Sequence, residues 1–393
     1  MIVAIDTLSL SKQYANTGTY AYSGNLLKGC LRIAESTTPG IKFHVFVAPG
    51  DDWAVNSFVS PFLHVHETRI LTRKRFWRLG GMALSTSLVR PDLVFLPTGQ
   101  SSIPSPFSPV VTTILDAMPK RLPPHLVGGG TGSRFLTWTS ANMANRVLTI
   151  SEWSKRDLVE IYGLNPGNVE VTYLGYDKRL YNDVPPDPEV SAELLGRFGI
   201  RRPFILHHGM VQLRKNVHRL IQAWDRVHER DRDFSVQLVL AGAMGHGHEE
   251  ILRVRETSRN RDRVILTGAL PDAELATLVK NASLCAIPSL YEGFCLPMVE
   301  AMACGVPTVA SNSSCIPEVS GSVLEYFDPL SVEEMGETIR CALEDSELRG
   351  RLRDRGLARA AEFSWERCAR ETLRIFVGTV AEHGRKRSTA SPS

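Results

Sequence analysis

The sequence predicts an α/β protein made of two doubly wound, Rossmann-like domains. The chain has 393 residues, which is too long for a single hydrophobic core and ample for two. Short apolar runs alternate with helical patterns along both halves, which is typical of parallel sheets covered by helices on both faces. The turn-rich stretch 181–188 interrupts this alternation and predicts a linker between the two domains.

The first half predicts an N-terminal domain over residues 1–185. Its short apolar runs, each bounded by turn residues, are typical of buried parallel strands. Strands are expected at 2–6, 43–48, 62–66, 92–96, 110–114, 147–150 and 169–173. Helical patterns between them include 20–33, 134–143 and 154–162.

The second half repeats the alternation and predicts a C-terminal domain over residues 186–365. Strands are expected at 204–208, 236–241, 264–267, 284–287, 308–310 and 323–327, and helices at 217–229, 273–279, 297–304 and 332–343. A final helix is expected at 366–383. The polar and basic tail 384–393 is predicted to be disordered.

The composition describes an ordinary globular protein, with 43% hydrophobic and 22% charged residues. A net charge of +3 is too small to indicate a nucleic-acid partner. The seven cysteines are odd in number and scattered, which favours free thiols in a reducing compartment. No apolar run reaches the roughly 18 residues of a membrane-spanning helix, and a strand pattern follows Met1 directly. We therefore expect a cytoplasmic protein.

The stretch from Ser289 to Thr308 organises the site. Pro297 suits the first turn of a helix and Gly305 suits the left-handed residue after its end. Glu292 is then expected in the loop after a strand, and Glu300 in the first turn of the helix. That loop lies at the carboxyl edge of a parallel sheet, and the positive helix N-terminus suits a diphosphate. Two carboxylates there match sugar hydroxyls, so the pattern indicates a sugar nucleotide.

The segment EGFCLPMVE followed by AMACGVPTVAS resembles the Glu-x7-Glu signature of the retaining glycosyltransferases of family 4, which have the GT-B fold. The resemblance implies that Glu292 contacts the donor sugar and Glu300 the nucleotide ribose. It also implies a donor site that includes the residues between them, Gly293, Phe294, Cys295 and Leu296. The family usually has glycine at the position of Cys295, a departure that affects the loop and the choice of donor.

Residues 207–216, HHGMVQLRKN, resemble the family's Gly-x4-Arg-Lys-Asn element. Arg214 and Lys215 match its basic pair. Cleavage of the anomeric bond leaves negative charge on a nucleoside diphosphate, and two fixed cations stabilise that charge. Solvated surface cations are the alternative, but their place at a helix start, against the helix dipole, argues against it. Met210 stands where some relatives carry a further arginine.

Two features of the first half also resemble the family. Gly18 matches the glycine loop that opens the first long helix, where it lets donor or acceptor approach the backbone; an ordinary turn is an equal alternative. Asp116 matches the strand–His–Asp element, with Leu115 at the histidine position. Asp116 is expected to orient the acceptor or to hold its loop, and a purely structural role at a strand end stays open.

Residues 71–79 place four cations around two aromatic residues. This segment predicts peripheral contact with anionic lipid at the inner membrane face, while packing or acceptor contact is equally consistent. Metal binding is not expected. His246 and His248 do not make a tetrahedral site by themselves, and the Asp231-Arg-Asp233 sequence is typical of a solvated turn.

The resemblance implies a GT-B enzyme whose domains face a cleft and whose final helix returns to the first domain. The expected activity is retaining, metal-independent transfer of a hexose from a GDP-mannose-like or UDP-hexose donor to a glycan or lipid-linked saccharide, with no cofactor. The alternatives are a non-catalytic nucleotide-binding partner of another glycosyltransferase, which Leu115 favours, and a phosphorylase or epimerase on the same scaffold.

Overall fold

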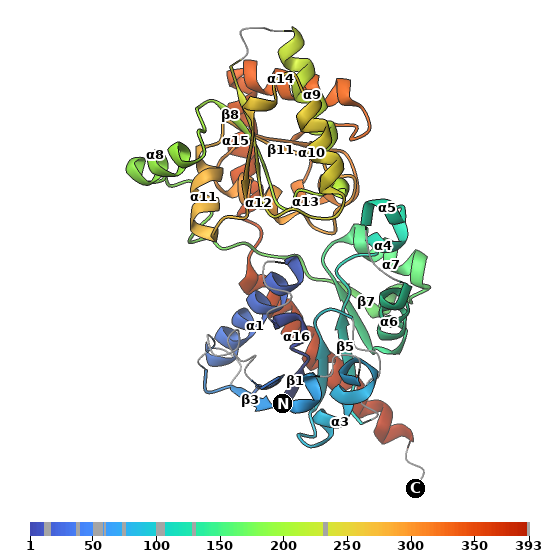
Figure 1. Cartoon of the computed structure of the whole chain (residues 1–393). Helices are drawn as coiled ribbons and strands as arrows, with labels where there is room; N and C mark the ends of the chain where they lie inside the picture. The colour runs from blue at the N-terminus through green and yellow to red at the C-terminus, as the bar shows by residue number, and fades with distance from the viewer. Residues whose placement is uncertain are drawn as a thin grey trace. The chain divides into compact units, whose positions relative to one another are not determined.

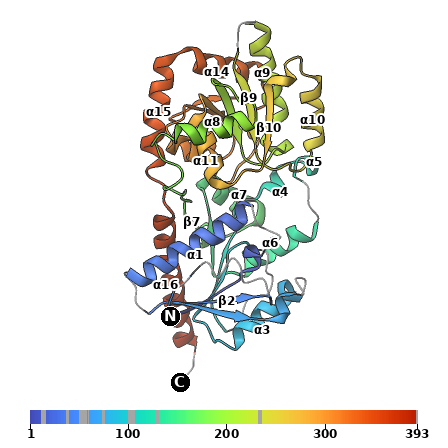
Figure 2. The same cartoon turned by 60° about the vertical axis from the view of Figure 1, so that its left-hand side comes forward.

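The computed structural model describes residues 1–11, 17–36, 40–49, 58, 60–72, 76–99, 107–127, 131–230 and 235–390. The chain forms two compact units (Figure 1; Figure 2). The first comprises Met1–Ala117, Gly129–Gly175 and Ser364–Ser393, and the second comprises Met118–Gly128 and Tyr176–Phe363. Each unit contains a parallel sheet with helices around it, so the predicted fold class is confirmed.

The sheet of the first unit has the strand order β3-β2-β1-β4-β5-β6-β7, and every neighbouring pair is parallel. Because the order reverses beside β1, the connecting helices lie on both faces, as in doubly wound folds. The strands are β1 (Ile2–Ile5), β2 (Lys42–Val47), β3 (Leu63–Glu67), β4 (Leu93–Leu96), β5 (Val110–Thr113), β6 (Arg146–Thr149) and β7 (Val169–Val171).

The helices of the first unit include the last one of the chain. They are α1 (Gly18–Ser36), α3 (Met82–Ser87), α6 (Thr131–Met143), α7 (Glu152–Tyr162) and α16 (Trp365–Ala390), with short helical turns η1 (Leu8–Leu10), η3 (Arg69–Thr72), η4 (Trp77–Gly81) and η5 (Pro166–Asn168). α1 and α16 pack closely, since a Cβ on Gly29 would lie 2.8 Å from Ala369 Cβ. The rings of Phe95 and Phe376 are 4.9 Å apart and join α16 to the sheet.

The sheet of the second unit has the order β10-β9-β8-β11-β12-β13, again with parallel pairs throughout. The reversal falls between β8 and β11. The strands are β8 (Phe204–His208), β9 (Gln237–Ala241), β10 (Val264–Gly268), β11 (Leu284–Ile287), β12 (Thr308–Ser311) and β13 (Glu325–Phe327).

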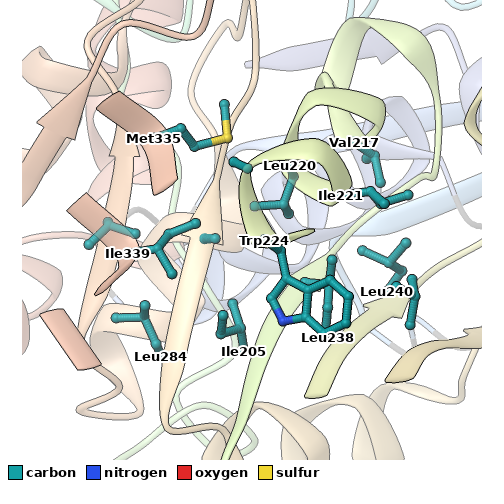
Figure 3. Close-up of a cluster of buried hydrophobic side chains, with 14 of the residues drawn as sticks. Ile205, Val217, Leu220, Ile221, Trp224, Leu238, Leu240, Leu284, Met335 and Ile339 are labelled. Carbon is teal, nitrogen blue, oxygen red and sulfur yellow. The ribbon is translucent and has the colours of Figure 1, made fainter. Parts of the chain in front are cut away.

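A core centred on Trp224 holds one face of this sheet (Figure 3). Trp224 is fully buried on α9 (Val217–Arg230), and Leu220 and Ile221 of the same helix point with it toward the strands. Met335 and Ile339 of α14 (Val332–Glu344) belong to the same core. The helices of the unit are α4 (Met118–Arg121), α5 (Pro124–Val127), α8 (Pro188–Arg197), α9 (Val217–Arg230), α10 (His248–Thr257), α11 (Asp272–Asn281), α12 (Leu296–Ala303), α13 (Ile316–Ser320), α14 (Val332–Glu344) and α15 (Ser346–Ala360), with η6 (Leu213–Lys215) and η7 (Arg261–Arg263).

Three details differ from the sequence prediction. The long segment of the second unit begins at Tyr176 and not at residue 186, so the turn-rich stretch 181–188 belongs to that unit, as does 118–128. Helix α16 continues to Ala390, although residues from 384 onward were expected to be disordered. The helix meets no proline before Pro392, and Gly384 alone costs a helix only about 1 kcal/mol.

The third difference concerns the helix that follows β11. α12 begins at Leu296, so Glu300 is its fifth residue and lies in the second turn and not in the first. The expected helix end is confirmed, because Gly305 has a φ of +67°. Glu292 lies in the loop between β11 and α12, as predicted.

Candidate active site

The candidate site lies where the strand order of the second sheet reverses. β8 and β11 are neighbours there, and both end at the carboxyl edge of the sheet. The segment after β8 carries Arg214 and Lys215, and the loop after β11 carries Glu292. Ligands of doubly wound folds bind at this kind of reversal point, because the two outgoing loops diverge and leave room between them.

Glu292 joins the two segments through a buried ion-pair cluster. Arg214 Nη1 lies 3.2 Å from Glu292 Oε2, and Lys215 Nζ donates a short hydrogen bond to Glu292 Oε1. Ser289 Oγ donates to the same oxygen at 2.6 Å. The Glu292 side chain is 8% exposed and that of Lys215 is 10% exposed, so water screens these charges weakly. The structure therefore brings together three of the predicted catalytic residues.

The charge state of Glu292 follows from competing effects. Burial alone would raise its pKa, but the charges of Lys215 and Arg214, with hydrogen bonds from Lys215 and Ser289, outweigh burial and lower the pKa to about 2. Glu292 is therefore a carboxylate at any physiological pH. In this form it can accept hydrogen bonds or hold cations.

Asn216 explains the position of the basic pair. It is fully buried in the left-handed conformation, with a φ of +59°, which asparagine tolerates better than most residues. Its side-chain amide donates to Pro288 O at 3.0 Å and to Pro329 O at 2.7 Å. These bonds fasten the turn after β8 to the loop after β11, so the cations and Glu292 are held on a common frame.

Two residues with positive φ hold the Glu292 loop. Cys295, the residue before α12, has a φ of +71°, and Ser314 in the loop after β12 has a φ of +52°. Such a backbone strains residues that carry a Cβ, so the Cys295 position would suit glycine. Ser314 Oγ accepts a hydrogen bond from the Glu292 N–H at 2.9 Å.

The other predicted donor residues lie around the start of α12. Burial raises the pKa of the Cys295 thiol to about 12, so this thiol stays neutral. Phe294 is buried, and its ring packs edge-on against Phe363 at 5.3 Å, which gives it a structural role. Gly293 precedes Phe294 in the loop, and Leu296 opens the helix. Their contact with a donor remains a prediction.

Glu300 has a different neighbour from Glu292. Its Oε2 lies 3.3 Å from His208 Nε2, and its side chain is 18% exposed. His208 ends β8, and its Nδ1 lies 3.8 Å from Cys285 Sγ on β11. His208 lies in the segment 207–216 that resembles the family, but the sequence predicts no role for it. Its contact with α12 is a tertiary feature that no sequence pattern indicates.

His207, on the same strand, was also missed. It is buried, its Nδ1 lies 3.1 Å from Ala286 O, and burial lowers its pKa to about 3. The ring is therefore neutral, and Nδ1 carries the proton that the carbonyl accepts. His207 supports the end of β8 beside the end of β11, where the two strands begin to separate.

Two predicted residues belong to the first unit. Asp116 follows β5 and is half-buried, and the neighbouring Leu115 O accepts a hydrogen bond from Thr149 Oγ1 at 3.4 Å. Gly18 is the first residue of α1, and a Cβ there would meet no atom of the described chain within 4 Å. Nothing in the described chain itself requires glycine at this position, so approach of a substrate remains a prediction.

The segment 71–79 is only partly described. Trp77 is fully buried, and its Nε1 donates to Asp6 Oδ1 at 3.0 Å. Trp77 is therefore a core residue and does not face a membrane, whereas Phe76 is 52% exposed. Arg73, Lys74 and Arg75 lie outside the described residues. None of the helices in the described part of the chain combines the length and apolar character needed to span a membrane.

Among the described residues, no three histidine, cysteine or acidic side chains are grouped so that they could hold a metal ion. His246 Nε2 lies 3.0 Å from His125 O, and His248 Nδ1 lies 3.0 Å from Gly245 O. Each ring thus has a backbone carbonyl as its neighbour, which is consistent with a structural role. Asp231 and Asp233 lie outside the described residues.

Comparison with protein families gives a match over residues 197–359 to the glycosyl transferases group 1. O-antigen chain mannosyltransferase B of Escherichia coli is 30% identical over 238 residues, which cover 60% of this chain and 61% of that protein. The MMP alpha-(1->4)-mannosyltransferase of Mycolicibacterium hassiacum is 31% identical over 245 residues, covering 61% of this chain and 56% of that protein. The matches thus span about three fifths of the length of these relatives.

Solved structures resemble the chain over nearly its whole length. Sucrose-phosphate synthase from Thermosynechococcus elongatus has a TM-score of 0.76 at 18% identity and covers 97% of this chain and 100% of that chain. HepE of Anabaena, solved in complex with UDP and glucose, has a TM-score of 0.74 at 18% identity and covers 96% of this chain and 100% of that chain. At these identities the likeness establishes the fold.

Proposed function

We propose that the protein is a retaining hexosyltransferase, because residues 197–359 match the group 1 glycosyl transferases and the chain has the GT-B fold. Its donor is a nucleotide diphosphate sugar and its acceptor is a glycan or a lipid-linked saccharide. The second unit binds the donor, and the first unit supplies acceptor contacts that include Asp116. No metal ion is required, since Arg214 and Lys215 supply the positive charge.

The observation that carries this proposal is the cluster of Arg214, Lys215 and Glu292 at the reversal point of the second sheet. A guanidinium and an ammonium group held together at the carboxyl edge of a sheet form a site for a diphosphate. Beside them, an ionised carboxylate suits the hydroxyl groups of a sugar. The start of α12 contributes the positive end of a helix dipole to the same place.

The chemistry follows from these charges. The bond between the anomeric carbon and the diphosphate oxygen breaks, and its electron pair remains on the nucleoside diphosphate. Arg214 and Lys215 stabilise that negative charge as it develops. The acceptor hydroxyl attacks the sugar on the face that the leaving group vacates and transfers its proton to the departing diphosphate oxygen, so the anomeric configuration is retained. Glu292 orients the sugar so that this carbon meets the acceptor.

Mannose is the sugar that the relatives support best. The two mannosyltransferases described above share 30% and 31% identity with this chain. Their alignments extend beyond the matched family domain, because 238 and 245 residues exceed the 163 of residues 197–359. GDP-mannose is therefore the first donor to test, followed by UDP-hexoses.

The deciding experiment incubates the full chain with GDP-mannose or a UDP-hexose and a panel of saccharide and lipid-linked acceptors. Release of nucleoside diphosphate that depends on the acceptor, together with an α-linked product from an α-linked donor, is the expected result. Glu292→Gln serves as the matched inactive control. An inverted product would contradict retention. Binding of the donor without turnover with any acceptor would favour the non-catalytic alternative, and a product isomerised without transfer would favour an epimerase.

A further inference from the structure

His208 connects the end of one central strand to the helix that carries Glu300. The imidazole is 1% exposed. Its two nitrogens face different partners, with Nδ1 3.8 Å from Cys285 Sγ and Nε2 3.3 Å from Glu300 Oε2. A single buried ring thus lies against β11 on one side and against α12 on the other.

The protonation of Cys285 indicates which nitrogen of His208 carries the proton. Burial, followed by smaller effects of Cys295 and Cys304, raises the pKa of the Cys285 thiol. The neutral S–H group can donate to Nδ1, whereas a carboxylate can only accept. Both neighbours are satisfied when the lone pair is on Nδ1 and the proton is on Nε2. In that tautomer an N–H group is directed at Glu300.

The contact with Glu300 is close but is not aligned as a hydrogen bond, and His208 Nε2 has no other aligned partner among the described residues. A buried N–H group without an aligned acceptor has lost its hydrogen bonds to water and has not gained an equivalent bond within the protein. The Glu300 side chain, at 18% exposed, can turn and can also meet a ligand.

We infer that His208 is a positioning residue that orients the Glu300 carboxylate toward the ribose of the bound nucleotide. The inference rests on the donor-binding role proposed above for the second unit. With Oε2 directed at the imidazole, Oε1 forms the other edge of the carboxylate and accepts hydrogen bonds from the ribose. Contact with the ribose turns the Glu300 carboxylate so that Oε2 accepts an aligned hydrogen bond from His208 Nε2. The imidazole and the ribose therefore favour the same orientation of the carboxylate.

This arrangement has a consequence for selectivity that a structural histidine would not have. A carboxylate held at a fixed angle discriminates strongly between a ribose that offers its 2′-hydroxyl and a 2′-deoxyribose that does not. A carboxylate free to rotate finds a partner in either sugar and discriminates weakly. The preference for ribonucleotide over deoxyribonucleotide should therefore depend on His208, even though His208 does not touch the sugar.

The test compares two carboxamides at position 208. The amide of His208→Gln reaches approximately to the place of Nε2, whereas the shorter His208→Asn reaches only to that of Nδ1. Calorimetry with GDP and 2′-deoxy-GDP, or with UDP and 2′-deoxy-UDP if the chain prefers uridine, gives the selectivity ratio. His208→Gln should keep the wild-type ratio to within about threefold. His208→Asn should lower the selectivity ratio about tenfold, mainly by weakening the binding of the ribonucleotide. A loss of this size is expected for a hydrogen bond to a charged group.

Two further variants exclude a general effect of losing a buried imidazole. His228 is buried on α9 of the same unit, where its Nδ1 lies 3.3 Å from Trp224 O. His228→Leu should leave the ratio unchanged, whereas His208→Leu should lower it as His208→Asn does. In a Glu300→Gln background, His208→Asn should cause no additional loss, because its effect passes through Glu300.

The outcomes separate the inference from the proposed function. Equal ratios for wild type, His208→Gln and His208→Asn, with ribonucleotide binding intact, would overturn the positioning role and leave the proposed function standing. A wild-type chain that binds none of these diphosphates would overturn both. If His208→Asn does not fold in a thermal unfolding assay, His208→Leu decides the question, and an unchanged ratio in that variant has the same meaning.

Discussion

Arg214 Nη1 lies 3.2 Å from Glu292 Oε2, although the two residues are 78 positions apart in the sequence. The same nitrogen donates to Tyr291 O at 2.9 Å, so the guanidinium is fixed by the loop that carries the carboxylate. Lys215 reaches the other oxygen of Glu292. The carboxylate thus offsets one of the two positive charges that we propose for the diphosphate, and a diphosphate would compete with it for both cations.

This competition predicts an unusual result for Glu292→Gln. Removing the negative charge should strengthen the binding of nucleoside diphosphate or pyrophosphate several-fold, because the cations no longer have an internal counter-charge. Turnover of the complete donor should fall by about 100-fold, because the sugar loses its orienting group. Calorimetry and a turnover assay measure the two effects. Diphosphate binding that weakens in parallel with turnover would mean that Glu292 only supports the loop.

Glu300→Gln is the control for that experiment. It removes a negative charge from the same unit, but the neighbour of Glu300 is His208 and not the basic pair. Binding of nucleoside diphosphate should therefore weaken, while pyrophosphate binding should stay close to that of wild type. An increase in pyrophosphate affinity equal to that of Glu292→Gln would show that net charge, and not the specific ion pairs, determines binding.

Arg214→Ala and Lys215→Ala should each reduce transfer by about 2 to 4 kcal/mol of transition-state stabilisation, as for other fixed charges near a leaving group. Lys215→Ala should also lower thermal stability more than Arg214→Ala, because the Lys215 side chain is 10% exposed and that of Arg214 is 17% exposed. Arg253→Ala, an exposed substitution on α10, is the control. Wild-type turnover in both single variants would exclude a role in catalysis.

Removal of divalent metal should not affect transfer. If the basic pair alone neutralises the diphosphate, turnover measured in excess EDTA should equal turnover in magnesium to within about twofold. The Arg214→Ala variant sharpens this experiment, because added magnesium should not restore its activity. Loss of wild-type activity in EDTA, with recovery on adding one particular metal, would show that a metal ion carries charge that we assign to the protein.

The first unit should lose stability in mild acid. His44 on β2 stacks against His64 of β3 with 4.6 Å between ring centroids, and its Nδ1 lies 2.8 Å from His66 Nε2. Burial first, then the charges of His64, His66 and Lys42, lowers the pKa of His44 from 6.5 to about 4. Between these values the unfolded chain binds the proton more readily, so the stabilisation is complete above pH 6.5 and is lost as the pH falls toward 4.

The variant His44→Phe keeps a ring in the stack and removes the titrating group. Between pH 7.5 and 5 the wild-type first unit should lose more thermal stability than this variant, as followed by calorimetry. Substitution of His228 in the second unit should not change the pH dependence of the first. An identical decline in wild type and His44→Phe would assign the acid sensitivity to other groups.

The sequence predicted the elements well because its signals were local. All predicted strands are present, since each is a short apolar run between turn residues, and Gly305 ends α12 as its type suggested. Glu292, Arg214 and Lys215 were found through their motifs, and the structure shows them together. What no pattern in the sequence could reveal is that they pair with one another.

Other features depended on contacts between distant segments. His208 and Glu300 are far apart in the chain, and only the packing of β8 against α12 brings them to 3.3 Å. Trp77 is buried and donates its N–H to the carboxylate of the distant Asp6, which supports the packing alternative that the composition of 71–79 left open. The assignment of 118–128 to the second unit is likewise a tertiary result.

The composition of the first unit has a consequence for synthesis on the ribosome. Its sheet is finished once β7 has been made, but α16, which packs against α1 and places Phe376 on Phe95, is translated only after the entire second unit. During synthesis we therefore expect the first unit to keep an apolar face uncovered until α16 has been made. The second unit consists of residues 118–128 and 176–363, so it can complete its fold first. We expect a chain released early at residue 363 to keep every residue of the proposed donor site, to leave that face exposed and therefore to bind chaperones.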